Sequence, residues 1–235
     1  MFTPSVPRRA FTLIELLTAF VLLGILIALG FGVATWARSR AKEARCRGNL
    51  RQIGAALIAY ANQNGGRLPD NTSDGVWAWD LKYSVIQLLG RPEELKDLAY
   101  CPAGEYSDKD LLWDGFATAG FRAIGYVLLL PGTPSVNPTE LNHGLTPSPY
   151  VAMTGELRNP PAARKELAVD ATISAGYLNF TRVQGMAPTP HRANHLDGER
   201  PGGGNIVFLD GHVAWRPFGE MVNHVVDPRR TWFWW

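Results

Sequence analysis

One stretch near the N-terminus constrains the fold of this chain most: residues 11–36 are apolar apart from a single charged side chain, Glu15. As an α-helix, this stretch would extend about 39 Å, which exceeds the ~30 Å hydrocarbon core of a bilayer. A secretory signal peptide has a shorter apolar core, of about 7–15 residues, with its small-residue cleavage site after that core. Here the small residue, Ala10, comes before it. We therefore predict a membrane-spanning helix over residues 11–36, preceded by a basic leader, residues 1–10.

Glu15 is the unusual residue of this apolar stretch. A carboxylate inside a membrane segment costs about 2.5–3.5 kcal/mol even on the lenient insertion scale, so it needs a partner. A cut between Ala10 and Phe11 would create an amine on Phe11, one helical turn from Glu15. The two charges could then neutralise each other within one subunit or between neighbouring subunits of a fibre.

Residues 10–15, Ala-Phe-Thr-Leu-Ile-Glu, together with the basic leader and the apolar helix, resemble the class III signal of type IV pilins and type II secretion pseudopilins. In that family a prepilin peptidase cuts before the Phe and N-methylates it to methylphenylalanine. The resemblance implies processing at Ala10 and Phe11 and filament assembly through Glu15 and the apolar helix, although the family usually has Gly where this chain has Ala10. It also implies three partners: the prepilin peptidase, other pilin-like subunits and an inner-membrane assembly platform.

Charge and length bear on the location of the rest of the chain. The sequence carries 23 basic and 21 acidic residues, and loss of Arg8 and Arg9 would leave 21 of each, which argues against a nucleic-acid partner. Six basic residues between Arg38 and Arg51 would favour the cytoplasm by the positive-inside rule. The cleavage signal implies the opposite orientation, and we follow the signal. The predicted location is therefore the bacterial cytoplasmic membrane, single-pass, with the C-terminal domain outside the cytoplasm, and then a surface or periplasmic filament.

The helix is expected to continue beyond the apolar stretch, because no proline interrupts residues 37–62. Apolar side chains recur there at steps of three and four and give one stripe, made of Leu50, Ile53, Leu57 and Tyr60. Asn64-Gly65-Gly66 and Pro69 are stop signals. We predict one helix with an apolar half, 11–36, and an amphipathic half, 37–64. The fold class is α+β, with this helix packed on a small antiparallel sheet with long loops, in a domain over residues 65–235.

Shorter elements follow the helix. Helices are predicted at residues 81–89 and 93–98, and strands at 123–130, 150–153, 167–169 and 177–183. The strongest hairpin signal is Asp210-Gly211 between the β-rich runs 205–209 and 212–216. It predicts a two-residue turn with positive φ at both central residues.

A second resemblance concerns a subgroup of pilin-like proteins with a Cys, Asn-Leu, Gln-Ile-Gly and a Gly-x-x-Pro exit on the helix, a later Cys-Pro, and a C-terminal His, Asn and Asp-Gly. The matching residues here are Cys46, Cys101, His195, Asn205, Asp210 and Gly211. His195 lies further from Asp210 than the usual nine residues, so His191 is a second candidate for the histidine of the motif. The resemblance and the extracytoplasmic location together favour a disulfide between Cys46 and Cys101, with two buried free thiols as the alternative.

A catalytic or metal site is the other hypothesis for the C-terminal region, based on the residues His191, His195, His212, Asp197 and Asp210. Prolines and glycines argue against a helix that would pair the histidines, and no Gly-x-Ser-x-Gly or Cys-x-x-Cys motif is present. We therefore predict no catalytic residue, no cofactor and no metal; the best metal alternative is Ca²⁺ on Asp197, Glu199 and Asp210. The predicted function is a non-enzymatic subunit of a type IV pilus or type II secretion-type filament. The alternative is a membrane-anchored extracytoplasmic binding or hydrolytic domain.

Overall fold

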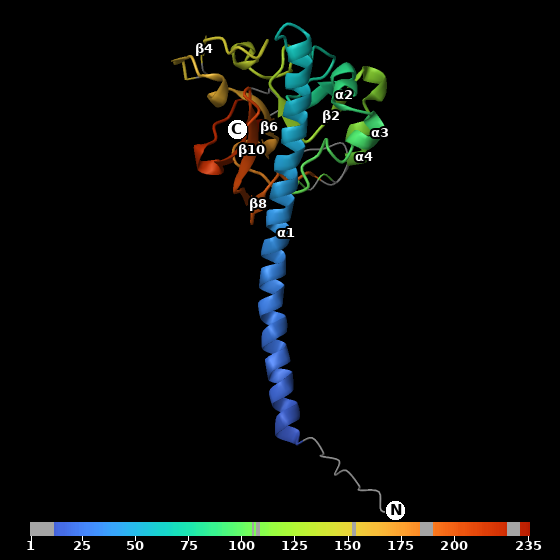
Figure 1. Cartoon of the computed structure of the whole chain (residues 1–235), viewed down its shortest axis with the longest axis vertical. Coiled ribbons are helices and arrows are strands. Elements are labelled where there is room, and N and C mark those ends of the chain that lie inside the picture. The colour runs from blue at the N-terminus through green and yellow to red at the C-terminus, as the bar shows by residue number, and fades with distance from the viewer. Residues whose placement is uncertain (1–11, 105, 107–108, 152–153, 184–189, 225–230) are drawn as a thin grey trace, which may run out of the picture. The chain divides into compact units, whose positions relative to one another are not determined.

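The computed structural model describes residues 12–104, 106, 109–151, 154–183, 190–224 and 231–235, without the side chains of residues 30–36. One helix, α1, runs from Leu13 to Gln63, as the proline-free sequence predicts (Figure 1). All the paired strands that the structure describes are antiparallel, so the predicted α+β class is confirmed. The chain divides into two compact units, residues 1–41 and 42–235, and α1 contributes to both.

The first unit presents an apolar helical surface. Every large apolar side chain from Leu13 to Leu29 is at least half exposed, on all sides of the helix. Among the helices described with their side chains, none is both long and apolar enough to cross a membrane. The predicted leader, residues 1–10, and the first residue of the predicted membrane segment lie outside the described residues, as do the side chains of 30–36.

In the second unit, residues 42–63 of α1 bury the predicted apolar stripe. The fully buried members recur at steps of three and four: Cys46, Leu50, Ile53, Leu57 and Ala61. Tyr60, which the stripe was predicted to include, is only partly buried, and Ala61 takes the inward position. The helix ends as predicted, because Gly65 and Gly66 adopt positive φ and Gly66 N–H donates to the Ala61 carbonyl at 2.7 Å.

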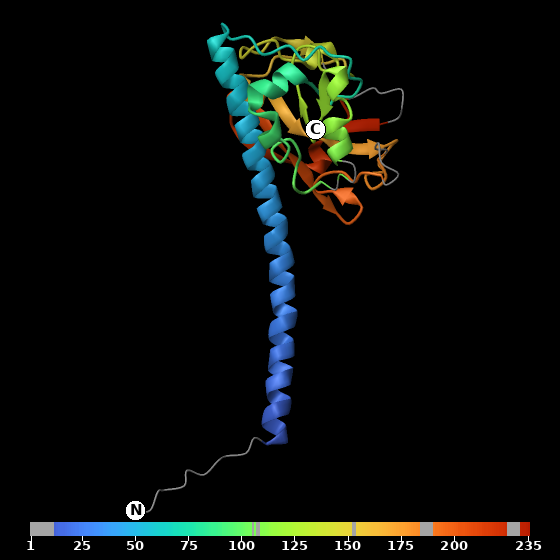
Figure 2. The same cartoon turned by 90° about the vertical axis from the view of Figure 1, so that its right-hand side faces the viewer.

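The main sheet of the second unit has four antiparallel strands in the order β11-β10-β6-β3. These strands are β3 (Tyr126–Leu128), β6 (Glu166–Asp170), β10 (Gly203–Phe208) and β11 (Val213–Pro217). β10 is buried along its whole length. Residues 42–63 of α1 run along one side of the second unit (Figure 2) and contact β10. Gly54 marks the contact, since a Cβ at this position would lie 2.6 Å from Val207 Cγ2. The backbone of α1 at Gly54 is therefore in close contact with the Val207 side chain of β10.

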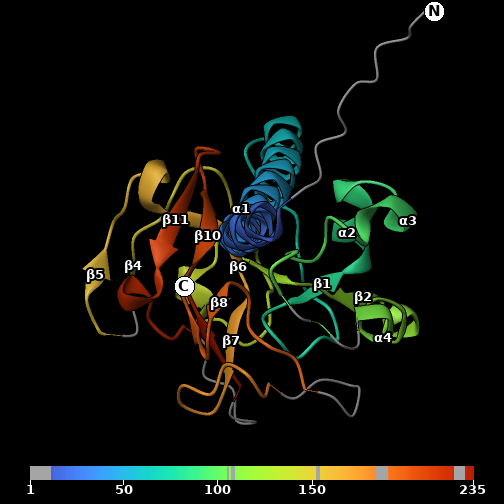
Figure 3. The ribbon, with the colours of Figure 1, turned by 90° about the horizontal axis from the view of Figure 1, so that it is seen from below.

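Smaller elements surround this core. The short helices α2 (Tyr83–Leu89), α3 (Pro92–Leu95) and α4 (Lys109–Asp114) lie on the opposite side of α1 from β10 and β11 (Figure 3). The strands outside the main sheet form antiparallel pairs: β1 (Asp80–Lys82) with β2 (Phe121–Ala123), β4 (Tyr150–Val151) with β5 (Leu157–Arg158), β7 (Thr172–Ala175) with β12 (Thr231–Trp234), and β8 (Leu196–Asp197) with β9 (Arg200–Pro201). Single 3₁₀ turns occur at Ala117–Ala119, Pro138–Glu140, Ala162–Arg164 and Phe218–Glu220.

One predicted strand is wrong. The extended segment is Thr172–Ala175, not 177–183, and the chain turns at Gly176 and Leu178, which both adopt positive φ. Apolar and aromatic residues occur on both sides of this turn, so their composition does not locate the strand. The other predicted helices and strands correspond to α2, α3, β3, β4 and β6, with shifted ends.

The predicted hairpin forms from β10 and β11, but its turn differs from the prediction. Phe208 N–H donates to the His212 carbonyl at 3.0 Å, and Gly211 N–H donates to the Phe208 carbonyl at 2.9 Å. The loop therefore has three residues, and only Gly211 has positive φ, at +88°. The prediction of positive φ at Asp210 as well is wrong. Asp210 instead accepts the backbone N–H of His212 through Oδ1 at 3.1 Å.

Replacing Gly211 tests this turn. We expect Gly211→Val to lower the free energy of unfolding by about 1–3 kcal/mol, because a β-branched residue resists left-handed backbone. Gly211→Asn places a Cβ in the same space, but Asn tolerates this φ, so it should cost clearly less. Denaturant unfolding of both variants measures the difference. Equal losses in the two variants would mean that crowding near Ile58, and not backbone conformation, requires the glycine.

Two glycines on α1 form a second matched pair. Gly54→Ala should destabilise the protein by about 1–2 kcal/mol, because the new methyl group overlaps the buried Val207 side chain. Gly48→Ala, where a Cβ would meet nothing within 4 Å, should stabilise it by up to about 1 kcal/mol through helix propensity. Unfolding curves of the two variants provide the measurement. Stabilisation in both would contradict close contact between α1 and β10, whereas rescue of Gly54→Ala by Val207→Ala would support it.

Candidate functional site

The first unit contains a capping box at the start of α1. Thr12 N–H and Thr12 Oγ1 donate to Glu15 Oε2 at 2.8 and 2.7 Å, and Glu15 N–H donates back to Thr12 Oγ1 at 3.3 Å. These reciprocal bonds satisfy backbone donors that a helix N-terminus otherwise leaves without partners. Glu15 therefore has a local role that its isolation in an apolar stretch did not suggest.

The capping box does not test the predicted pairing of Glu15 with the amine of Phe11. Ala10 and Phe11 lie outside the described residues, so their cleavage, methylation and contacts stay predictions. Both bonds from Thr12 go to one carboxylate oxygen, Oε2. Within the described residues no donor to Oε1 occurs, so this oxygen can accept one that the processed chain or a neighbouring subunit would supply.

The second unit contains a buried polar centre around Asp170, at the end of β6. Asn205 supplies two donors to its Oδ2, the backbone N–H at 2.8 Å and Nδ2 at 3.2 Å. Asn194 Nδ2 donates to Oδ1 at 3.3 Å, and Asn194 Oδ1 in turn accepts the Tyr106 hydroxyl at 2.8 Å. This network holds the carboxylate in one orientation inside the core.

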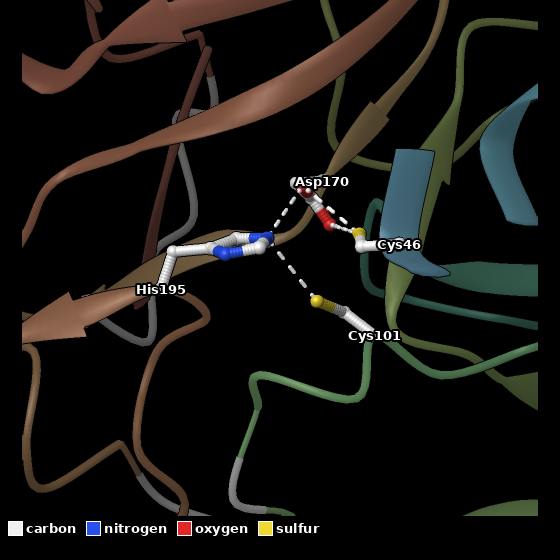
Figure 4. A group of neighbouring side chains, drawn as sticks. All are labelled: Cys46, Cys101, Asp170 and His195. Carbon is white, nitrogen blue, oxygen red and sulfur yellow. Dashed lines mark hydrogen bonds and ion pairs between the residues drawn. The ribbon is translucent and has the colours of Figure 1, made fainter. Parts of the chain in front are cut away.

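Two cysteines and a histidine complete the centre (Figure 4). Cys46 Sγ donates to Asp170 Oδ1 at 3.0 Å, His195 Nε2 lies 3.2 Å from Asp170 Oδ2, and Cys101 Sγ lies 3.3 Å from His195 Nε2. The ligand atoms of all four residues lie within 4.8 Å of one another. They come from α1, from the loop after α3, from the end of β6 and from the residue before β8. No other group of three or more such side chains occurs in the part of the chain that the structure describes.

The charges of this centre depend on each other. Burial alone would raise the pKa of Asp170, but hydrogen bonding from His195 and its charge, with further bonds from Cys46 and Asn205, hold that pKa below its usual value. Burial alone would lower the pKa of His195, yet hydrogen bonds to Asp170 and Cys46 and the charge of Asp170 raise it to about 10. A carboxylate and an imidazole therefore stabilise each other in an environment that excludes water.

The two thiols are also buried. Burial raises the pKa of Cys46 well above its usual value, and it raises that of Cys101 as well, so each thiol is protonated unless a cation replaces the proton. Both cysteines are free in this structure, which corresponds to the alternative given above for the predicted disulfide. A Cys46–Cys101 bridge stays a prediction, since the two sulfur atoms are close neighbours in the centre.

The arrangement of His195 differs from that of the histidine in a Cys–His–Asp catalytic triad. In a triad the imidazole uses one nitrogen for the nucleophile and the other for the carboxylate. Here the same atom, Nε2, faces both Cys101 Sγ and Asp170 Oδ2. His195 also adopts φ of +52°, an unusual conformation for a residue other than glycine. Its ring and that of Trp215 form a T-shaped pair with their centroids 5.1 Å apart. Backbone and packing thus direct one imidazole nitrogen into a group of sulfur and oxygen atoms.

The structure brings only some of the predicted site residues together. His195 and Asn205 meet at Asp170, whereas His191 is buried against the rings of Trp79 and Tyr106. Asp210 and Gly211 form the hairpin turn, where Asp210 Oδ1 also lies 2.6 Å from His212 Nδ1. Asp197 and Glu199 lie at the β8–β9 turn. In the described residues, none of the three calcium candidates, Asp197, Glu199 and Asp210, belongs to a group of three or more side chains that could hold a metal ion together.

Sequence reasoning missed Asp170, which organises the centre. The available signal was an acidic residue directly after the apolar strand residues 167–169, a position where a carboxylate usually has a specific partner once buried. It also missed Thr12, although Thr-x-x-Glu before an apolar run is the sequence signature of a capping box.

Comparison with known proteins bears on the first unit. Residues 7–31 match the family model described as the prokaryotic N-terminal methylation motif. No curated protein and no solved structure matches the chain. The motif supports a pilin-like chain that is a substrate of a prepilin peptidase.

Proposed function

We propose that this chain is a structural subunit of a type IV pilus or a type II secretion-type filament. The observation that carries the proposal is the N-terminal methylation motif over residues 7–31, because its chemistry prepares a helix for filament assembly. In this proposal a prepilin peptidase removes residues 1–10 and methylates Phe11. The processed helix first anchors the subunit in the cytoplasmic membrane, with the second unit outside the cytoplasm, and then joins the filament core.

The exposed surface of the first unit supports this role. A helical surface of apolar side chains from Leu13 to Leu29 is unfavourable in water, so lipid or other helices must cover it. Before assembly, lipid would surround this apolar surface. In the filament, the corresponding helices of other pilin-like subunits would pack against it. An inner-membrane assembly platform would transfer the subunit between the two environments.

The proposed role is structural and not enzymatic. The His195 geometry described above does not suit nucleophilic catalysis, and the methylation motif is typical of subunits that are themselves substrates. The alternative, a membrane-anchored binding or hydrolytic domain, would keep its leader or lose it without methylation. The proposal includes no nucleic-acid partner, because the chain is nearly neutral.

Intact mass of the membrane-extracted protein tests the processing. We expect a mass lower by residues 1–10 and higher by one methyl group, because the motif presents Phe11 to the peptidase as the new N-terminus. Ala10→Asp should leave the leader attached, since the position before the cut must be small. A full-length mass for the unaltered protein would refute the proposed function.

Substitutions at Glu15 separate capping from charge pairing. Glu15→Gln keeps an acceptor for the two Thr12 donors but removes the negative charge. Glu15→Val removes both. We expect both variants to insert into the membrane. Both should be depleted at least about tenfold in sheared filament fractions, because losing about 1.4 kcal/mol of binding free energy from the charge pair is enough for a tenfold change.

Thr12→Val is the matched control, because it removes the Thr12 hydroxyl from the capping box and leaves the carboxylate charge. It should assemble better than Glu15→Gln. If Glu15→Gln assembled as well as the unaltered protein while Thr12→Val did not, capping would be the role of Glu15, and charge pairing with Phe11 would be wrong.

A further inference from the structure

We propose that Cys46, Cys101, Asp170 and His195 bind one Zn²⁺ ion as a structural metal centre of the second unit. The four side chains offer two sulfur atoms, one imidazole nitrogen and one carboxylate, which are the ligand types that zinc takes in proteins. The proposal concerns the second unit and does not depend on the proposed role in filaments.

The spacing of the ligand atoms supports a tetrahedral site. With zinc bonds of about 2.0–2.3 Å, neighbouring ligand atoms of a tetrahedron lie about 3.3–3.8 Å apart. With Asp170 Oδ2 as the carboxylate ligand, three of the pairs are separated by 3.3 Å (Cys46 Sγ to Asp170 Oδ2), 3.2 Å (His195 Nε2 to Asp170 Oδ2) and 3.3 Å (Cys101 Sγ to His195 Nε2). A small outward shift of each side chain would place the ion at their centre.

A second shell of hydrogen bonds already orients the ligands. The N–H and Nδ2 groups of Asn205 fix Asp170 Oδ2, and Asn194 Nδ2 fixes Oδ1. The Tyr126 hydroxyl lies 3.6 Å from Cys46 Sγ, and Ala103 N–H donates to Cys101 Sγ at 3.4 Å. Such partners hold ligands in place and commonly accompany protein metal sites.

Burial indicates a structural role for the ion. Cys46, Cys101 and Asp170 are at most 2% exposed, and the side chain of His195 is 7% exposed, so four protein ligands would close the site against water. Cys101 also lines a hollow of about 250 Å³ together with Arg45, Asp97, Tyr100, Tyr106 and Lys109, among others. An ion in that hollow would lie next to Cys101, the one ligand of the four that lines it.

Zinc accounts for the centre better than a disulfide or calcium does. A Cys46–Cys101 bridge would use the two sulfur atoms and leave the convergence of Asp170 and His195 unexplained. Calcium requires six to eight oxygen ligands, and this centre offers one carboxylate among sulfur and nitrogen atoms. On zinc binding the two thiols and His195 Nε2 lose their protons to solvent. The two thiolates balance the double charge of the ion, and the Asp170 carboxylate adds one further negative charge.

The first experiment measures zinc and thiols in the full-length protein, purified in detergent without added metal. We expect about one zinc ion per chain by mass spectrometry. Both cysteines should react with a thiol reagent in denaturant without reductant, because zinc leaves when its ligands separate. A protein without zinc would overturn the proposal, whether its thiols are free or become reactive only after reduction; the latter result would establish the disulfide.

The second experiment measures stability and metal affinity. A chelator should lower the melting temperature, and Zn²⁺, but not Ca²⁺, should restore it, because the binding free energy contributes to folding. Cys101→Ser and His195→Gln should each weaken zinc binding by more than the roughly 10–100-fold that loss of a second-shell partner costs. Asp210→Asn is the control, since it alters an exposed His–Asp pair outside the centre, and it should retain zinc.

If a ligand variant fails to fold, Co²⁺ added to the metal-free unaltered protein gives an independent result. A thiolate-to-cobalt charge-transfer band would show that cysteines ligate the ion. Absence of this band, or a melting temperature that neither Zn²⁺ nor the chelator changes, would overturn the proposal.

Discussion

The buried carboxylate of Asp170 constrains the second unit more than any other group. Removing an ionised carboxylate from water costs several kcal/mol unless charges and hydrogen bonds replace the lost hydration. The replacing groups come from β10 (Asn205), from the segment before β8 (Asn194 and His195) and from α1 (Cys46). Because these partners come from three separate parts of the chain, the carboxylate is satisfied only when those parts pack correctly. The polar centre therefore specifies how helix, sheet and loops fit together.

Close packing of α1 on β10 places Cys46 in this centre. Gly54 allows the helix backbone to approach Val207, and Cys46 lies two helical turns earlier on the same buried face. A larger residue at position 54 would push the helix away from the sheet and move the thiol away from Asp170. The small residue at position 54 and the geometry of the polar centre therefore depend on the same distance between α1 and the sheet.

Local patterns predicted the elements of the fold but not the centre that joins them. The spacing of Leu50, Ile53 and Leu57 predicted the buried face of α1, because helical periodicity is a property of neighbouring residues. Cys46 and Asp170 are 124 residues apart, and no local pattern reports a contact of that range. The family resemblance drew attention to Cys46, Cys101, His195 and Asn205 separately. Only the folded chain shows that they meet at a carboxylate that the resemblance did not include.

Glu15 shows why a functional explanation based on charge should be weighed against local structure. Its carboxylate accepts two bonds from Thr12, so the unprocessed chain already gives it partners without any charge. Those bonds satisfy hydrogen-bonding capacity, but they leave a net negative charge in an apolar surface, and the cost of burying that charge remains. In the proposed function, the amine that processing would create at Phe11 would be the cation that neutralises this charge. Capping and the proposed pairing would then act on one side chain in succession: capping when the helix forms, and pairing when lipid or neighbouring helices exclude water.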